Sequence, residues 1–415
     1  MLITSLTILI LFISKDKFIK VNKLNCMIEF PLILLFSILF LFLLTSSYDF
    51  FGVYLSLEGL SLTLYVLAGM LHQGVVSVEG AIKYFSLGAI STGILLFGVS
   101  CLFCCVGGLD FLELQVFLGS NLFLKSFFEV KLSLLFITFG FLFKISAFPC
   151  HIWVADVYEG IWTPVTAYFA VVIKVGLILF YLRITFNTMF NILFFFQPIF
   201  IFISLGSIFI GALGAFKQTR IKRFIAYTSI NQVGFIFLGI ASCNLTGLIA
   251  SLIYTFLYSI MSINFFTLLL NINHVVTNRS MLYLSDLYCF CFYSVEGSNY
   301  LVLVILSMGG LPPLGGFLGK LFLYFALMEA RLDFTIFFSL ILSILTIYYY
   351  LSFVRFIWFE KSRVLKLYYL KKKVFLNFLL RFFSVVLLLF GLIFSGILPV
   401  FTYLSLSCLF PFIWN

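Results

Sequence analysis

The stretch that decides the fold is FGFLFKISAFPCHIWVADVYEGIWTPVTAYFAVVIKVG, which runs from Phe139 to Gly176. Its first apolar run carries Lys144 and breaks at Pro149, a short polar segment follows from His151 to Gly160, and a second apolar run carries Lys174. Proline ends or kinks a helix, because it lacks a backbone donor and clashes with the preceding turn. The stretch therefore predicts a broken apolar helix beside an unbroken one, each with a buried lysine.

The rest of the chain has the same apolar character. Of its 415 residues, 63% are hydrophobic and only 10% are charged, against roughly a quarter charged in an ordinary soluble protein. The fold class that follows is an all-α polytopic membrane protein with about 11–12 transmembrane helices, the first of them short. Apolar runs place these helices at residues 1–14, 28–47, 51–71, 78–106, 130–148, 163–184, 189–216, 224–243, 247–273, 298–328, 334–359 and 374–400.

Loop charges support this arrangement of helices. Most of the loop Lys and Arg residues lie in the segments 15–23, 217–223 and 361–373. Because consecutive helices alternate in direction, these segments fall on one face, and basic loops normally face the cytoplasm or the mitochondrial matrix. The net charge of +10 is therefore explained without a nucleic-acid partner.

Few residues are available as metal ligands. The chain has three histidines and nine scattered cysteines, and structural metal sites need several ligands at set spacings. The nearest approach is Cys101, Cys104 and Cys105, which lie in an apolar run and need no ligand role as small buried residues. The sequence therefore predicts no metal site.

Charged residues inside the expected helices are the main functional signal. Glu58 lies well inside its helix, and Glu79 precedes Lys83 by four residues, a spacing that pairs opposite charges on a helix. Each charge at mid-membrane costs at least about 2.5 to 3.5 kcal/mol, so we expect these groups to line a polar path. Lysine suits proton transfer, because burial favours its neutral form and a nearby carboxylate its charged form. A static ion pair between helices is the alternative, and is equally favoured for Glu79 with Lys83. The lysines within helices are Lys83, Lys144, Lys174 and Lys320.

A second break precedes Lys320. The stretch GGLPPLGG, from Gly309 to Gly316, contains Pro312 and Pro313 and cannot continue a regular helix. Unwound backbone at membrane depth is tolerated only where protein or water covers it. Gly/Pro-interrupted segments in both halves of a chain indicate an inverted-repeat transporter with its working site beside the breaks, although a kink of purely packing significance is the alternative.

The breaks also suggest how the chain is organised. We expect one transmembrane domain that contains two antiporter-like inverted repeats and ends in a C-terminal helix. The expected ranges are 1–415 for the domain, 50–184 and 189–359 for the repeats, and 374–400 for the final helix.

Polar residues near the breaks extend the expected path. His151, Asp156 and Glu159 are expected in a loop after the first break, where they either feed protons to Lys144 or form a solvated loop that caps the next helix. Gln232 places an amide in an apolar helix, which is explained either by interhelical hydrogen bonding or by the lining of a water path.

Several stretches resemble characteristic segments of the chain 2 family of respiratory complex I, the proton-translocating NADH:ubiquinone oxidoreductase. Chains 4 and 5 and the related cation/proton antiporters have similar broken helices, but DVYEG, from Asp156 to Gly160, is more similar to chain 2. The stretches lie at Leu57–Gly69, Val78–Ala89, Phe139–Gly176, Lys217–Phe235 and Ser307–Lys320.

The resemblance implies an antiporter-like subunit of the complex I membrane arm, located in the mitochondrial inner membrane. The family members bind no redox cofactor and help to couple quinone reduction elsewhere to proton transfer. Carried over by motif, Glu58 is the carboxylate paired with Lys144, and Lys174 is the central lysine. Lys320 is the lysine of the second broken helix, towards the exit.

Other positions extend the resemblance or depart from it. Glu79 and Lys83 match a further acidic and basic pair of the family. Many relatives have histidine where this chain has Gln232, so this position is expected to relay protons only through hydrogen bonds. Full-length relatives have four helices before the Glu58 helix, and here there is room for one clear helix and one short one. The resemblance thus implies that the missing helices are either lost or supplied by a separate polypeptide. It also implies that the other membrane-arm subunits and membrane lipids are partners.

Two other functions remain open. The first is a free-standing cation/proton antiporter subunit, which association with redox subunits would distinguish from a complex I chain. The second is a structural scaffold that has lost pumping. A scaffold has no reason to keep buried charges that cost kilocalories, so the intact lysines argue against it.

Overall fold

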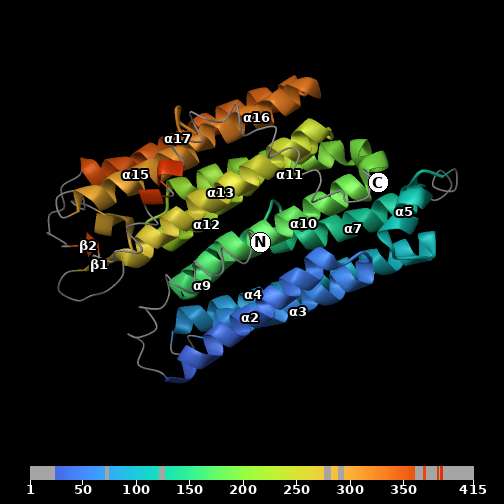
Figure 1. Ribbon diagram of the computed structural model, residues 1–415, viewed down its shortest axis with the longest axis horizontal. Coiled ribbons are helices and arrows are strands. Elements are labelled where there is room, and N and C mark those ends of the chain that lie inside the picture. The colour runs from blue at the N-terminus through green and yellow to red at the C-terminus, as the bar shows by residue number, and fades with distance from the viewer. Residues whose placement is uncertain are drawn as a thin grey trace. The chain divides into compact units, whose positions relative to one another are not determined.

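Long apolar segments form helices throughout the described part of the chain, as Figure 1 shows. The chain divides into two units, Met1–Ile199 and Phe200–Asn415. The computed structural model describes residues 24–70, 74–120, 127–274, 282–287, 294–359, 368–370, 381–382 and 384–386. The expected helices at 1–14 and 374–400 therefore lie outside the described residues, apart from a few positions of the latter.

The first unit is built around α4, which packs against α3, α7 and α8, while α2 packs against α3. Small residues allow these helices to pack closely. At Gly98 of α4, for example, a side chain would place its Cβ only 2.9 Å from the backbone nitrogen of Ile137 in α7, so the two helices could not pack this closely. The elements are α2 (Leu24–Ser46), α3 (Phe50–Gly69), α4 (Val75–Val106), α5 (Phe111–Leu118), α7 (Phe127–Ile145), α8 (Ile152–Gly160), α9 (Thr163–Tyr168), the π-helix η1 (Phe169–Ile173), α10 (Lys174–Asn187) and η2 (Phe190–Ile192).

The second unit is built around α13, which packs against α12, α15 and α16. A short antiparallel sheet pairs Ile272 with Leu370 and His274 with Tyr368. The elements are α11 (Leu193–Phe216, which begins in the first unit), α12 (Ile221–Ala241), α13 (Leu245–Asn271), β1 (Ile272–His274), η3 (Leu284–Leu287), α15 (Val295–Gly309), α16 (Gly315–Glu329), α17 (Asp333–Trp358) and β2 (Tyr368–Leu370).

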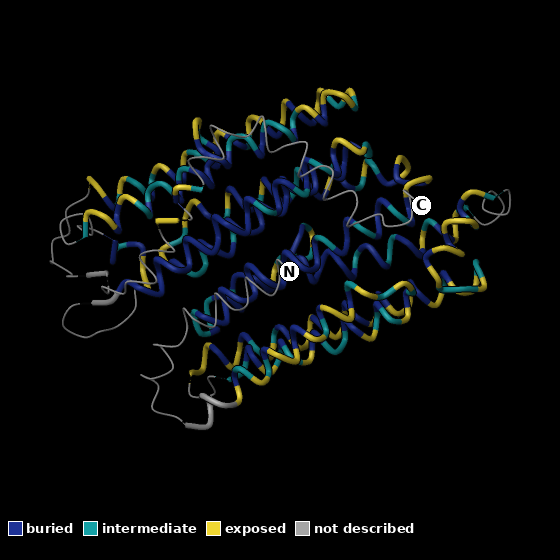
Figure 2. The backbone as a smooth tube through the Cα atoms, viewed as in Figure 1, coloured by how far each residue is buried: buried dark blue, intermediate teal, exposed yellow. Residues whose placement is uncertain are grey.

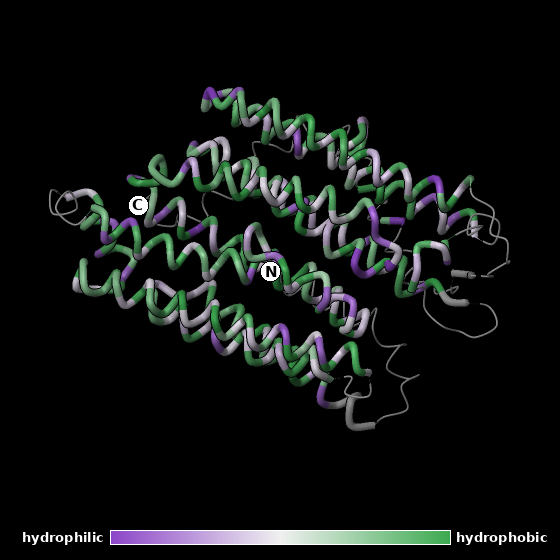
Figure 3. The backbone as a smooth tube through the Cα atoms, turned by 180° about the vertical axis from the view of Figure 1, so that it is seen from behind, coloured by the Kyte–Doolittle hydropathy of each residue, from purple (hydrophilic) through white to green (hydrophobic). Residues whose placement is uncertain are grey.

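The chain is a multi-pass membrane protein of the all-α class, as predicted. Eight helices in the described residues are long and apolar enough to cross a membrane. Their burial differs: the windows in Ile221–Ala241 and Leu245–Asn271 are 94% buried, whereas those in Val75–Val106 and Asp333–Trp358 are only 33% buried, a difference visible in Figure 2. Figure 3 shows that the helices are apolar along most of their length, which suits their exposed faces to lipid.

Three local features refine or correct the expected ranges. The break expected within the segment 298–328 is confirmed, because this segment forms two helices, α15 and α16, separated at residues 310–314. The segment expected as a loop after Pro149 is mostly helical, because α8 covers Ile152–Gly160. The helix α5 was not expected, since its eight residues are too few to give a membrane-spanning signal. The division into repeats at 50–184 and 189–359 stays a prediction.

Candidate functional site

The first break is a tightly capped helix end. Helix α7 ends at Ile145, before the predicted Phe148, because Ser146 takes a left-handed conformation with φ of 66°. The backbone N–H of Ser146 donates to the carbonyl of Phe143 at 3.1 Å, and that of Ala147 donates to the carbonyl of Leu142 at 3.0 Å. This is a Schellman motif, which closes the last turn of a helix on itself. Pro149 follows the cap and does not itself interrupt the helix.

Lys144 lies in the last turn of α7 and is buried. Its Nζ lies 5.8 Å from the ring centre of Tyr65 on α3 and within electrostatic reach of Glu58. Among the described residues, neither Nζ of Lys144 nor Oε2 of Glu58 has a hydrogen-bond partner, although both atoms are buried. The two groups that the family resemblance pairs therefore interact through space without a direct hydrogen bond.

Lys174 is the first residue of α10, directly after the π-helix η1. Its side chain is 2% exposed, and its Nζ lies 5.6 Å from the ring centre of Tyr158 on α8. A π-helix has one extra residue per turn, and such segments are frequent at functional sites because they re-aim the side chains that follow. The π-helix thus sets the direction in which Lys174 leaves its helix.

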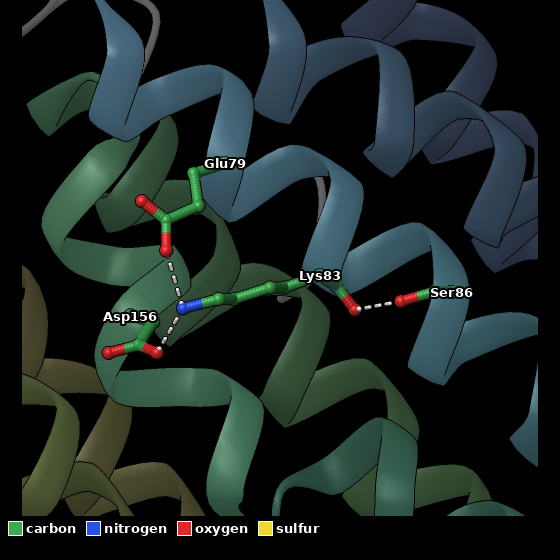
Figure 4. Close-up of polar contacts among 4 residues, drawn as sticks. All are labelled: Glu79, Lys83, Ser86 and Asp156. Atoms are coloured by element: carbon green, nitrogen blue, oxygen red, sulfur yellow. Dashed lines mark hydrogen bonds and ion pairs between the residues drawn. The ribbon is translucent and has the colours of Figure 1, made fainter.

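Glu79, Lys83 and Asp156 form an ion-pair cluster that joins α4 to α8 (Figure 4). The Nζ of Lys83 lies 2.8 Å from Oε1 of Glu79 and 2.9 Å from Oδ2 of Asp156. The pair expected from sequence is present, and Asp156 is a second partner that the sequence did not indicate. All three side chains are partly exposed, which favours a static link between helices over a place on a buried path.

Of the three residues expected in a loop after the first break, two lie on a helix. Asp156 and Glu159 lie on α8, whereas His151 precedes that helix, with its Nδ1 3.2 Å from the carbonyl oxygen of Pro149. The prediction of a loop was wrong because a helix of nine residues is short, and its polar residues hide the apolar pattern. Their role in proton transfer stays a prediction.

The second break has the same kind of cap. Helix α15 ends at Gly309, and Gly310 has φ of 78°. The N–H of Gly310 bonds the carbonyl of Ser307 at 3.0 Å, and that of Leu311 bonds the carbonyl of Leu306 at 3.3 Å. This second Schellman motif also precedes the prolines, Pro312 and Pro313, so the glycine ends the helix.

Lys320 belongs to α16 and reaches back to the end of α15. Its buried Nζ donates to the carbonyl oxygen of Gly309 at 2.7 Å and lies 4.4 Å from the ring centre of Phe235. The C-terminal carbonyls of a helix carry partial negative charge, so they stabilise a cation. The lysine is thus held by a helix end and an aromatic ring.

Gln232 forms the centre of a buried hydrogen-bond network on α12. Its Nε2 donates to the carbonyl of Met308 at 3.1 Å and to the hydroxyl of Tyr350 at 3.4 Å. Its Oε1 accepts from the hydroxyl of Tyr254. The interhelical interpretation of Gln232 is therefore the one that the structure supports, and the amide contacts the carbonyl next to the one that holds Lys320.

Aromatic neighbours of the lysines are the site residues that sequence reasoning missed. Tyr65 lies two helical turns after Glu58, on the same face of α3, and this spacing was a usable signal. Tyr158 lies between Asp156 and Glu159, in a motif already noted, but its approach to Lys174 depends on the tertiary fold.

The site chemistry suits proton exchange. In the first unit, a half-buried carboxylate and two buried lysines lie near polarisable rings, and in the second a lysine lies at a helix end. Among the described residues, no three His, Cys, Asp or Glu side chains are placed to hold a metal ion. Two capped helix breaks, each with a buried lysine, define the class of antiporter-like membrane transport subunits.

The comparisons with known proteins agree with this class. The chain belongs to the family of NADH:quinone oxidoreductase and Mrp antiporter transmembrane subunits, whose sequence model matches residues 47–346. It is 34% identical over 370 residues to NADH-quinone oxidoreductase subunit N 1 of Rhizobium meliloti (strain 1021), covering 87% of this chain and 74% of the relative. It is 35% identical over 354 residues to NADH-ubiquinone oxidoreductase chain 2 of Marchantia polymorpha, covering 85% and 71%.

Solved structures share the fold. A chain of respiratory complex I from Thermus thermophilus with bound aureothin superposes with a TM-score of 0.73 at 26% identity, over 89% of this chain and 79% of that one. A chain of the Mrp complex from Dietzia sp. DQ12-45-1b has a TM-score of 0.79 at 19% identity, over 92% and 78%, and supports the fold alone.

Proposed function

We propose that this chain is an antiporter-like membrane-arm subunit of NADH:ubiquinone oxidoreductase that moves protons through Glu58, Lys144, Lys174 and Lys320. The observation that carries the proposal is the presence of a buried lysine at each of two capped helix breaks. A buried ammonium next to a helix end or a ring is stabilised without a tight ion pair, so small movements change its tendency to hold a proton. Secondary transporters place their working groups at such broken helices.

Lys174→Met tests the translocation role. Methionine keeps most of the side-chain volume and cannot carry a proton, so proton pumping by the assembled complex should fall by at least about tenfold, as when a proton-transferring group is lost. The control is Lys131→Met, since Lys131 lies near the start of α7 beside the rings of Phe127 and Phe195. Normal pumping in an assembled Lys174→Met complex would rule out the proposed role.

The proposal includes location and partners. Relatives named NADH-ubiquinone oxidoreductase chain 2 in Marchantia polymorpha and Oenothera berteroana support a mitochondrial inner-membrane location. The proposed partners are other membrane-arm subunits and membrane lipids. We infer that the chain binds no redox cofactor and takes part in the enzyme through proton transfer alone.

A further inference from the structure

Trp153 lies on α8, after the first helix break, and contacts the end of α7 before the break. It is the second residue of α8 and is 4% exposed. Its indole N–H donates to the carbonyl oxygen of Phe143 at 3.1 Å, the same oxygen that accepts the capping N–H of Ser146. Phe143 directly precedes Lys144, so this hydrogen bond joins the second half of the broken helix to the turn that carries the lysine.

Stacking fixes the orientation of the Trp153 ring. The ring stacks on Tyr84 of α4, with centroids 4.6 Å apart and planes 28° apart, and on Phe143 at 5.5 Å and 28°. Aromatic contacts of this kind contribute beyond the area that they bury. The ring is stacked on two neighbours, and its only donor, the indole N–H, is hydrogen-bonded, so its orientation is fixed. Trp153 therefore holds the end of α7 and the start of α8 in a fixed relative position.

Helix α4 anchors this arrangement at adjacent residues. Tyr84 stacks on Trp153, and its neighbour Lys83 pairs with Asp156, one turn further along α8. Tyr84 also makes an edge contact with Tyr65, at 4.9 Å and 75°, and Tyr65 presents its ring to Nζ of Lys144. A continuous set of aromatic contacts therefore runs from α8 to the ring beside the lysine.

We propose that Trp153 is a positioning residue for proton transfer, which fixes the last turn of α7 and so keeps the ammonium of Lys144 beside Tyr65. The inference rests on the proposed function, because it assigns Trp153 a part in the same reaction. Trp153 acts through the backbone of Phe143 and the ring of Tyr84. Loss of its N–H leaves the Phe143 carbonyl bonded to Ser146 alone, and so allows the end of α7, with Lys144, to move.

Trp153→Phe tests this role, because it keeps an aromatic ring and removes the donor. Cys150 lies within the break and is partly exposed, so its alkylation by N-ethylmaleimide reports opening of the break without turnover. In membranes that contain the assembled complex, we expect alkylation of Cys150 to become about fivefold faster. Loss of one hydrogen bond should increase the population of the open break by about this factor. We also expect fewer protons pumped per electron. Mass spectrometry of the Cys150 peptide and acidification per NADH oxidised measure the two values.

The matched control is Trp358→Phe, since Trp358 is 43% exposed on α17 and should leave both values unchanged. If Trp153→Phe does not assemble, Tyr84→Leu removes the stack instead and should produce both changes. An unchanged alkylation rate would overturn the proposal, and so would faster alkylation with an unchanged pumping ratio. Normal pumping by the Lys174→Met complex would overturn the proposed function. The alkylation rates of Cys150 would still show whether Trp153 holds the two sides of the break together.

Discussion

Lys144 and Lys320 both lie at helix breaks, but Lys144 precedes its break and Lys320 follows its own. Lys144 belongs to the half that ends at the break, whereas Lys320 belongs to the half that begins after it and reaches back to Gly309. The ammonium of Lys320 lies at a C-terminal helix end, whose carbonyls favour a positive charge, whereas that of Lys144 lies near the ring of Tyr65. A proton can leave such a site without the separation of a tight ion pair, which would cost more.

Glu58→Gln tests the role of the carboxylate. Glutamine keeps the shape and removes the carboxylate that acts on Lys144, so pumping should fall by about tenfold or more, as when a proton-transferring group is lost. Acidification by reconstituted complex is the measurement. Glu113→Gln on the short helix α5, where the side chain is exposed, is the control and should pump normally. Equal pumping by both variants would contradict the assigned role.

Ser146→Gly tests the cap of the first break. A left-handed conformation costs a non-glycine residue about 1 kcal/mol or more, so glycine should stabilise the cap and raise the midpoint of thermal inactivation. Ser146→Ala keeps the Cβ atom and should give no such gain. The prediction is wrong if alanine and glycine have the same effect.

At the scale of elements, apolar length predicted the helices well, because the thickness of a bilayer sets that length. The predicted ranges 163–184 and 224–243 fall close to the observed Thr163–Asn187 and Ile221–Ala241. Local conformation was harder. The π-helix at Phe169–Ile173 consists of ordinary apolar residues that an α-helix accommodates equally, so no sequence pattern marks it.

Site contacts were predictable only where they are local. The pair of Glu79 with Lys83 spans four residues and follows from helix geometry. The pair of Lys83 with Asp156 joins positions 73 residues apart, and only the packing of α4 against α8 brings them together. The contact of Trp153 with Tyr84 depends on the same packing.

Insertion of one alanine after Val171 tests the direction of Lys174. The π-helix already contains one more residue than an α-helical turn, so a further residue should rotate Lys174 by about 100° relative to the preceding turns. We expect the complex to assemble with its pumping strongly reduced, because Lys174 no longer faces Tyr158. Deletion of Val171 is the control, since it should return the segment to an α-helix, leave Lys174 facing Tyr158 and preserve pumping. Normal pumping after the insertion would show that the direction of Lys174 does not matter.

At the scale of the molecule, each unit carries its own set of buried or half-buried polar groups. The first contains Glu58, Lys144 and Lys174, and the second contains Lys320 and Gln232. Within the described residues, each set includes a lysine at a broken helix, as expected from the positions of the prolines and glycines. The proposed function therefore has a candidate proton-holding group in each unit.

The assembly of the whole chain can be tested directly. After mild detergent extraction and separation of intact complexes by size, the chain should comigrate with NADH dehydrogenase activity, as the family membership leads us to expect. Migration apart from that activity would favour a free-standing antiporter, and cation-driven proton exchange would then be the measurement to make.

The hydrogen bond of Lys320 to Gly309 also has a consequence for ion selectivity. Free carbonyls at a helix end can coordinate sodium, but here the carbonyls of Leu306, Ser307 and Met308 accept from protein N–H groups, and Lys320 donates to that of Gly309 at 2.7 Å. An alkali metal ion would have to displace a side chain that is covalently attached. Exchange of sodium for potassium or choline should therefore leave pumping unchanged, and pumping that depends on the alkali ion supplied would contradict this expectation.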